Sequence, residues 1–205
     1  MKKSFVVLVL LALVAPVMAV EFYGGGVYHN AATATPMNQS WGGELQIRQE
    51  IGDSGLFAGL GIGAHQWRMG DQDSSSSKWC ITKTEKYFGD VKDLPIELLA
   101  LYKAPLGDSK ILAFGELGVA YHITDTDIQY TEGISICGMG KQTTTDAGLS
   151  LGNLWTGRAG GGVEIPLGTN VSLAGSCGYQ WQLNQYLYGR VLEGLYGRVG
   201  LVIKL

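Results

Sequence analysis

The chain has 205 residues and a formal net charge of −3, and only 16% of its residues are charged, below the roughly 25% usual for soluble domains. Its 31 glycines are well above the usual share of about 7%. No segment gathers the basic residues that would follow a phosphate backbone, so the composition argues against a nucleic-acid partner.

Residues 1–19 are typical of a secretory signal peptide. Lys2 and Lys3 precede an apolar run from Phe5 to Val14, and small residues near Ala19 offer a cleavage point. This run is too short for a transmembrane helix, and no later segment has the roughly 20 consecutive apolar residues that such a helix needs. We therefore expect a signal peptide at 1–19 and one domain at 20–205.

The remaining chain contains eight segments in which apolar residues alternate with small or polar ones. In residues 40–51, for example, Leu45 and Ile47 face one way, whereas Glu44 and Arg48 face the other, because successive strand side chains point to opposite sides. Each segment is about as long as a strand tilted across a bilayer. The pattern predicts an all-β fold, a transmembrane antiparallel up-and-down β-barrel of eight strands at about 21–30, 40–51, 56–69, 94–103, 111–123, 153–165, 171–184 and 189–205.

The connections between these segments alternate in length. Residues 51–55, 104–110 and 166–170 are rich in Gly, Pro, Asp and Asn, as tight turns require. Residues 31–39, 70–93, 124–152 and 185–188 are mostly longer, and we expect irregular loops there. Membrane barrels have short periplasmic turns and long outer loops, so an even number of strands places both termini in the periplasm.

Aromatic residues fall near both ends of the predicted strands, where amphipathic rings favour the headgroup boundary. Trp41, Trp155 and Trp181 are expected at the outer boundary, and Phe22 and Tyr102 at the inner one. Together they predict two aromatic girdles.

The last strand, from Leu195 to Leu205, alternates like the C-terminal strand that the outer-membrane assembly machinery recognises. In this architecture the chain resembles the small eight-stranded barrels of the OmpA transmembrane-domain and OmpX type, across the whole region after residue 19. The final Leu205 departs from the phenylalanine usual there. The resemblance implies a monomer in the outer membrane of a Gram-negative bacterium, in contact with lipid and lipopolysaccharide.

Several charged residues lie on the polar side of the strands. Glu44, Glu97, Glu116, Arg158 and Arg198 are each six or seven residues from a periplasmic turn, so we expect one belt near the bilayer midplane. Glu116 and Arg158 are expected to pair, with Arg48 and Glu164 extending the network toward the periplasm. An eight-stranded barrel is just wide enough to be filled by side chains, which predicts a plugged lumen, with a gated ion path as the alternative.

Histidines and cysteines offer few other sites. His29, His65 and His122 lie near the outer strand ends, where hydrogen bonding at the hydrated rim is expected in preference to metal binding or pH sensing. Cys80 and Cys137 lie in the two longest loops, in an oxidising compartment, and are expected to form a disulfide. Cys177 belongs to an apolar strand face.

The function that these features favour is a noncatalytic surface protein, whose barrel holds outer loops for adhesion, envelope integrity or contact with a host, cell-surface or phage ligand. No cofactor or metal is expected. A lipid A-modifying enzyme is the first alternative, although no nucleophile and base lie together and Ser176 is deep in its strand. A narrow channel is the second. A soluble lipocalin-like barrel would instead turn its apolar face inward.

Overall fold

A computed structural model describes residues 19–31, 37–137, 139–146, 153–184 and 192–205. The expected signal peptide lies outside the described residues except for Ala19. Residues 32–36, 138, 147–152 and 185–188 of the expected outer loops, and residues 189–191 of the last expected strand, also lie outside them. In the described ranges no helix is long and apolar enough to cross a membrane.

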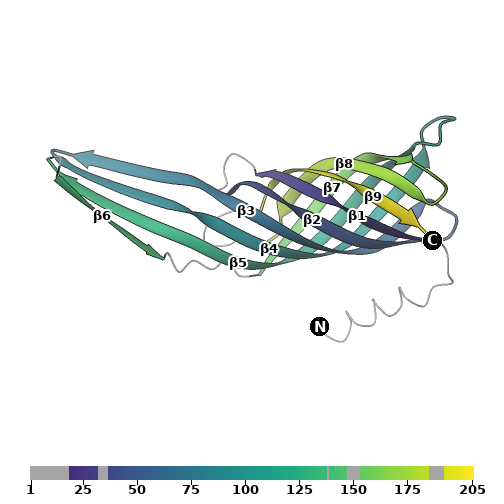
Figure 1. Cartoon of the computed structure of the whole chain (residues 1–205), viewed down its shortest axis with the longest axis horizontal. Coiled ribbons are helices and arrows are strands. Elements are labelled where there is room, and N and C mark those ends of the chain that lie inside the picture. Colours follow the sequence, from purple (N-terminus) through teal and green to yellow (C-terminus); the bar gives the residue numbers. More distant parts are fainter. Residues whose placement is uncertain (1–18, 32–36, 138, 147–152, 185–191) are drawn as a thin grey trace.

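The described residues form one antiparallel sheet (Figure 1). Its strands are β1 (Val20–Ala31), β2 (Met37–Glu50), β3 (Leu56–Lys78), β4 (Ile81–Pro105), β5 (Leu112–Ile136), β6 (Met139–Asp146), β7 (Leu154–Pro166), β8 (Val171–Gln182) and β9 (Gly194–Lys204). The wall runs in the order β4-β3-β2-β1-β9-β8-β7-β5, and pairing of β4 with β5 closes it. Eight strands therefore form the barrel, as predicted, and β6 is an addition outside it.

The barrel wall turns its apolar side outward. Along β4, Leu94, Ile96 and Leu98 are exposed, whereas the alternate residues Glu97 and Leu99 are buried. Leu60, Val119 and Leu201 are also exposed on the outside of the barrel. This orientation is the one that a hydrocarbon environment requires, and it is the reverse of a soluble lipocalin-like barrel.

The apolar outer surface ends at a defined level. Leu94 of β4 is paired with Ile123 of β5, and the next outward pair is Lys92 with Asp125. The outward apolar residues of β4 thus span residues 94–102, which is the strand length needed to cross a bilayer at a tilt.

The three tight turns lie at one end of the barrel, as predicted. Each is closed by a backbone hydrogen bond, from Ile51 N to Leu56 O at 2.7 Å in the first and from Leu106 N to Ile111 O at 2.9 Å in the second. Gly55 and Gly107 have positive φ values of 72° and 62°, which glycine adopts without steric cost. Leu205 N donates to Val20 O at this same end, so the last strand closes against the first.

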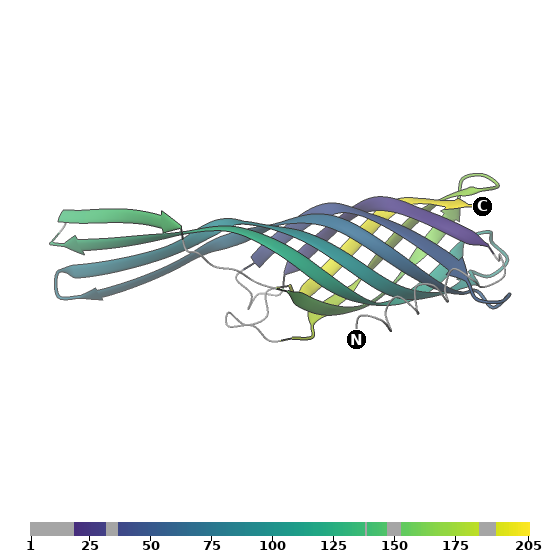
Figure 2. The same cartoon turned by 90° about the horizontal axis from the view of Figure 1, so that it is seen from below.

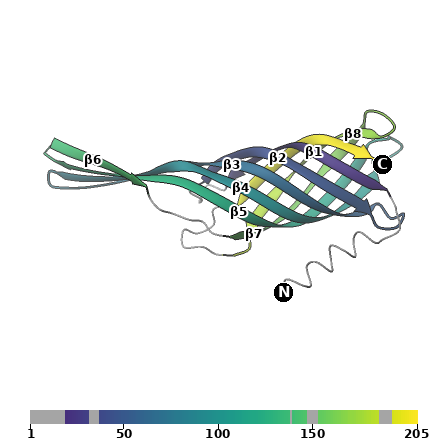
Figure 3. The same ribbon diagram turned by 60° about the horizontal axis from the view of Figure 1, so that its bottom comes forward.

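At the other end, the prediction of irregular loops at 70–93 and 124–152 is wrong for the described residues. β3, β4 and β5 leave the barrel and continue as one sheet, to which β6 adds a fourth strand (Figures 2 and 3). We call residues 72–78, 81–92, 125–136 and 139–146 the projecting sheet. From Lys92 to Ile81 the strand extends about 35 Å at about 3.3 Å per residue. Val91 and Ile128 are buried at its base, and its other described side chains are at least partly exposed, so the continuous apolar alternation that marks a membrane strand is missing.

Candidate functional site

The barrel lumen is filled with charged side chains. The seven residues predicted to form the internal network are all buried, and three further charged residues, Glu21, Asp93 and Lys103, are buried with them. Strand alternation explains the placement, since each of these residues lies on the inward side of its strand.

Five of these residues form a continuous chain of alternating charge. Glu44 accepts hydrogen bonds from Nη1 of Arg158 and Nη1 of Arg198, both at 3.1 Å. Arg158 also pairs with Glu97, and Arg198 with Glu116. We call Glu97, Arg158, Glu44, Arg198 and Glu116 the charge belt. Every member has an opposite charge beside it, which is the condition under which buried ions persist.

One predicted pair is wrong: Glu116 pairs with Arg198 and not with Arg158. Arg158 of β7 lies opposite Gly118 of β5. Glu116 lies opposite Gly160, two residues further along both strands. A Cβ at Gly118 would collide with the Glu97 carboxylate and would crowd the Arg158 side chain. The missing side chain at Gly118 therefore lets Arg158 reach across β5 to Glu97 on β4.

Toward the tight turns lies a second set of ion pairs, which we call the lower cluster. Lys103 Nζ donates to Glu21 at 2.5 Å and to Glu164 at 2.6 Å, and Lys204 Nζ lies 2.7 Å from Glu164. Glu164 thus extends the charge toward the end of the barrel that carries the tight turns. Arg48 instead donates to Gln46 at 2.9 and 2.7 Å and lies over the ring of Tyr23.

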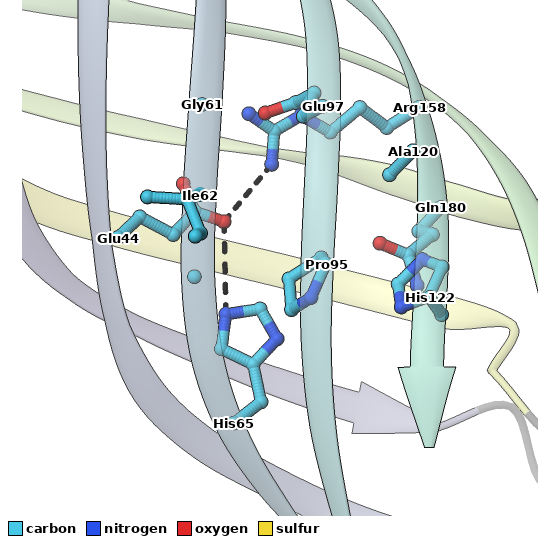
Figure 4. Close-up of a pocket in the computed structure, with 11 residues that line it drawn as sticks. Glu44, Gly61, Ile62, His65, Pro95, Glu97, Ala120, His122, Arg158 and Gln180 are labelled. Carbon is cyan, nitrogen blue, oxygen red and sulfur yellow. Dashed lines mark hydrogen bonds and ion pairs between the residues drawn. The ribbon is translucent and has the colours of Figure 1, made fainter.

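Apolar side chains fill the space around these ions. Tyr23, Phe57, Leu99, Leu101, Phe114, Ala174 and Val202 form one buried cluster inside the barrel. Beside the charge belt remains a cavity of about 10 Å³, lined by Glu44, His65, Glu97 and Arg158 among others (Figure 4). That volume holds about one water molecule, so the described lumen has no open pore at this level.

The three histidines lie deeper than the hydrated rim where they were expected. All are buried, because β3–β5 continue past them. Nδ1 of His122 lies 2.9 Å from Asp93 Oδ2, and its Nε2 lies 2.8 Å from Thr156 Oγ1. His65 lies 3.6 Å from Asp93 and borders the cavity (Figure 4). His29 packs on the ring of His65.

A metal site is not formed by these groups: no set of three His, Cys, Asp or Glu side chains in the described part of the chain is arranged to hold an ion. His122 hydrogen-bonds to Asp93 and Thr156, whereas His29 and His65 pack against each other. Asp93, which lies beside His65 and His122, is also 3.4 Å from Nε1 of Trp67.

The predicted girdle residues lie on the barrel wall. Trp41 and Trp155 are exposed near the outer strand ends, where Trp155 packs beside Tyr121 with ring centroids 5.0 Å apart. Trp181 is half-buried on the adjacent strand. Phe22 and Tyr102 are exposed toward the tight turns.

Sequence reasoning missed four inward groups: Glu21, Trp67, Asp93 and Lys103. A signal for two of them was available, since Asp93 and Lys103 share the parity of Glu97 along one strand. The sequence predicts a loop at Asp93, and Lys103 is the last residue of its predicted strand. The partners of each group come from other strands, so the sequence offered no pairing.

The far end of the projecting sheet is closed by a disulfide between Cys80 and Cys137, the pair expected from the sequence. Cys137 N also donates to Cys80 O at 2.7 Å. Cys177 is a free, exposed cysteine on the barrel wall. Further along the sheet, Lys83 contacts Glu85 at 2.6 Å and Glu132 at 3.2 Å. Hydrogen bonds to these two carboxylates raise the pKa of Lys83.

Removing the disulfide should loosen the far end of the projecting sheet. We expect Cys80→Ser together with Cys137→Ser to increase amide hydrogen exchange in residues 81–87 and 129–136 by roughly tenfold, because the outermost strand pair then frays freely. Exchange in barrel residues 94–103 should not change. Cys177→Ser is the control and should alter neither region; equal exchange in the double variant and the native chain would contradict the expectation.

The comparisons with known proteins concern the fold. No protein-family model matches the sequence, and no curated protein matches it. Among solved structures, the outer membrane protein OprG from Pseudomonas aeruginosa has a TM-score of 0.53 at 12% identity, covering 92% of this chain and 96% of OprG. A major outer membrane protein from Thermus thermophilus has a TM-score of 0.51 at 14% identity, covering 92% of this chain and 100% of that protein. The fold of this chain is therefore a closed eight-stranded antiparallel β-barrel, like that of these outer membrane proteins.

Proposed function

We propose that this chain is a noncatalytic outer-membrane surface protein, in which a closed barrel anchors the projecting sheet for contact with partners outside the cell. The observation that carries the proposal is the continuation of β3, β4 and β5 beyond the apolar wall into a four-stranded sheet. A structure of this length adds nothing to spanning the bilayer, so it favours a role in the surroundings of the cell.

The filled lumen supports an anchoring role over a transport role. The charge belt crosses the interior from β4 to β5 by way of β2, β7 and β9, and the cavity beside Glu44, Glu97 and Arg158 holds about one water molecule. Ser176, the hydroxyl considered for lipid chemistry, contacts Glu116 and Arg198 in the lumen and no histidine. The proposal therefore includes neither conduction nor catalysis.

Surface labelling tests the orientation, with Cys177→Ser as the background. Ser76→Cys places a thiol on the projecting sheet, and Thr169→Cys places one in a tight turn; both positions are exposed. On intact cells, a membrane-impermeant maleimide should label Ser76→Cys only, and after permeabilisation it should label both. Labelling of Thr169→Cys alone would show that the projecting sheet faces the periplasm and would overturn the proposal.

A truncated variant tests the role of the projecting sheet. Replacing residues 69–89 with Asn-Gly and deleting residues 128–146 keeps the paired wall strands, so the barrel should still show heat-modifiable gel mobility. Cells carrying the full chain should adhere to cultured epithelial layers more than cells carrying the truncated chain. Both proteins should be silent in planar bilayers and leave lipid A unchanged. Conductance steps that vanish on altering Arg158 would favour the channel instead.

A further inference from the structure

The tip of the projecting sheet, which we define as residues 78–83, 134–137 and 139–141, differs in character from the rest of the chain. Its ionisable side chains are Lys78, Lys83 and Lys141, and it contains no Asp or Glu, in a chain whose formal net charge is −3. Positive charge is therefore concentrated at the end of the molecule farthest from the barrel (Figure 1).

The register places apolar residues between these lysines on one face. The outermost row across the four strands is Lys78, Ile81, Ile136 and Met139, since each of these residues pairs with the next. Ile136 is 53% exposed and Met139 is 81% exposed. The adjacent row contains Lys83, the exposed Ile134 and Lys141. The opposite face carries Thr82, Ser135 and Gly140, so the apolar character belongs to one side.

A tryptophan forms the extreme end of this surface. Trp79 lies in the turn between β3 and β4 and is 94% exposed. Its φ of 60° is a conformation that asparagine and glycine adopt more readily. The Cys80–Cys137 disulfide and the hydrogen bond from Cys137 N to Cys80 O hold this turn beside the end of β5.

We propose that the tip inserts into the headgroup region of an apposed anionic lipid bilayer. This inference rests on the proposed function, because it requires the projecting sheet to lie outside the cell. Tryptophan favours the boundary between hydrocarbon and headgroups, and exposed Ile and Met side chains gain free energy by leaving water. Lysines beside them are attracted by anionic headgroups.

The charge distribution at the tip favours an anionic lipid bilayer as the binding partner over an apolar groove on a protein. Lys83 is compensated by Glu85 and Glu132 behind it, whereas Lys78 and Lys141 form no ion pair with a described residue. Two uncompensated cations that flank an apolar row complement a surface of negative charge over hydrocarbon. An apolar groove on a protein would leave both ammonium groups without a counterion.

Vesicle sedimentation tests the proposal with the full chain held in phosphatidylcholine nanodiscs. The native protein should sediment with vesicles of 30% phosphatidylglycerol in phosphatidylcholine and not with pure phosphatidylcholine vesicles. Lys78→Gln with Lys141→Gln should weaken this binding about 30-fold. Trp79→Ser with Met139→Ser should weaken it about tenfold. The matched control, Lys92→Gln with Lys110→Gln, removes the same charge elsewhere and should bind like the native chain.

A second readout locates Trp79 directly. Target vesicles made with brominated lipid should quench part of the tryptophan fluorescence, and Trp79→Phe should abolish this quenching. Trp67 is buried in the barrel, and Trp41, Trp155 and Trp181 lie on the barrel wall that the nanodisc surrounds. Heat-modifiable mobility and an intact Cys80–Cys137 disulfide show that each variant is folded. Absence of sedimentation, equal weakening in the control, or absence of quenching would overturn the proposal. Ser76→Cys labelling on intact cells would still support the proposed function after any of these results.

Discussion

Replacing Glu44 with Gln should lower the free energy of unfolding by about 3–5 kcal/mol, as expected when one member of a buried ion network is removed. Glu44 is the carboxylate that joins Arg158 to Arg198, with each nitrogen 3.1 Å away. After the change both guanidinium groups stay in the lumen, and each keeps a single carboxylate partner, Glu97 or Glu116. Guanidinium unfolding in phospholipid vesicles, followed by tryptophan fluorescence and gel mobility, measures the loss.

The matched control for Glu44→Gln is Asp108→Asn, which makes the same chemical change in an exposed tight turn. Its effect should stay within about 0.5 kcal/mol, the range for surface substitutions. If both variants unfold at the native denaturant concentration, Glu44 is not part of a dry ionic network, and the account of the plugged lumen is wrong.

Replacing Lys103 with Met should have a comparable effect, also about 3–5 kcal/mol. The Lys103 ammonium donates to Glu21 at 2.5 Å and to Glu164 at 2.6 Å, and all three side chains are buried. Without Lys103, Glu21 loses the cation beside it, whereas Glu164 keeps Lys204. The same unfolding assay in vesicles measures the difference.

Lys204→Met provides the comparison for Lys103, because both lysines contact Glu164 but the Lys204 side chain is 33% exposed. Solvent screening should limit its effect to about 0–1 kcal/mol. Adding Glu21→Gln to Lys103→Met should restore part of the stability, since it removes the unpaired buried charge. A loss of stability in Lys204→Met equal to that in Lys103→Met would show that burial does not set the strength of these pairs.

The sequence predicted the barrel because a lipid environment imposes a strict rule on each strand. Residues such as Leu60 and Leu201 must face hydrocarbon, and the alternate residues must face the lumen, so the period of two is visible without any knowledge of partners. The tight turns were visible for a similar reason, because their Gly, Pro, Asp and Asn residues act locally. The inward placement of Glu44, Arg158 and Arg198 followed from the same parity.

Outside the membrane this rule disappears, and there the prediction of loops was wrong. Residues 74–77 are four serines whose polar character is typical of a loop, yet they pair along β4. Ile81, Thr82 and Thr84 are β-branched, and such residues favour strands. This signal does not depend on apolar alternation, on which the predicted strands were based.

The sequence by itself determined which side chains face lipid and which face the lumen, since alternation along one strand is a local property. Only the tertiary structure decided which charges meet, since Arg158 reaches Glu97 over Gly118 and Lys103 joins Glu21 to Glu164. It also decided that the histidines are buried inside the barrel. These contacts join strands distant along the chain, and their geometry depends on the register and closure of the whole barrel, which no single segment encodes.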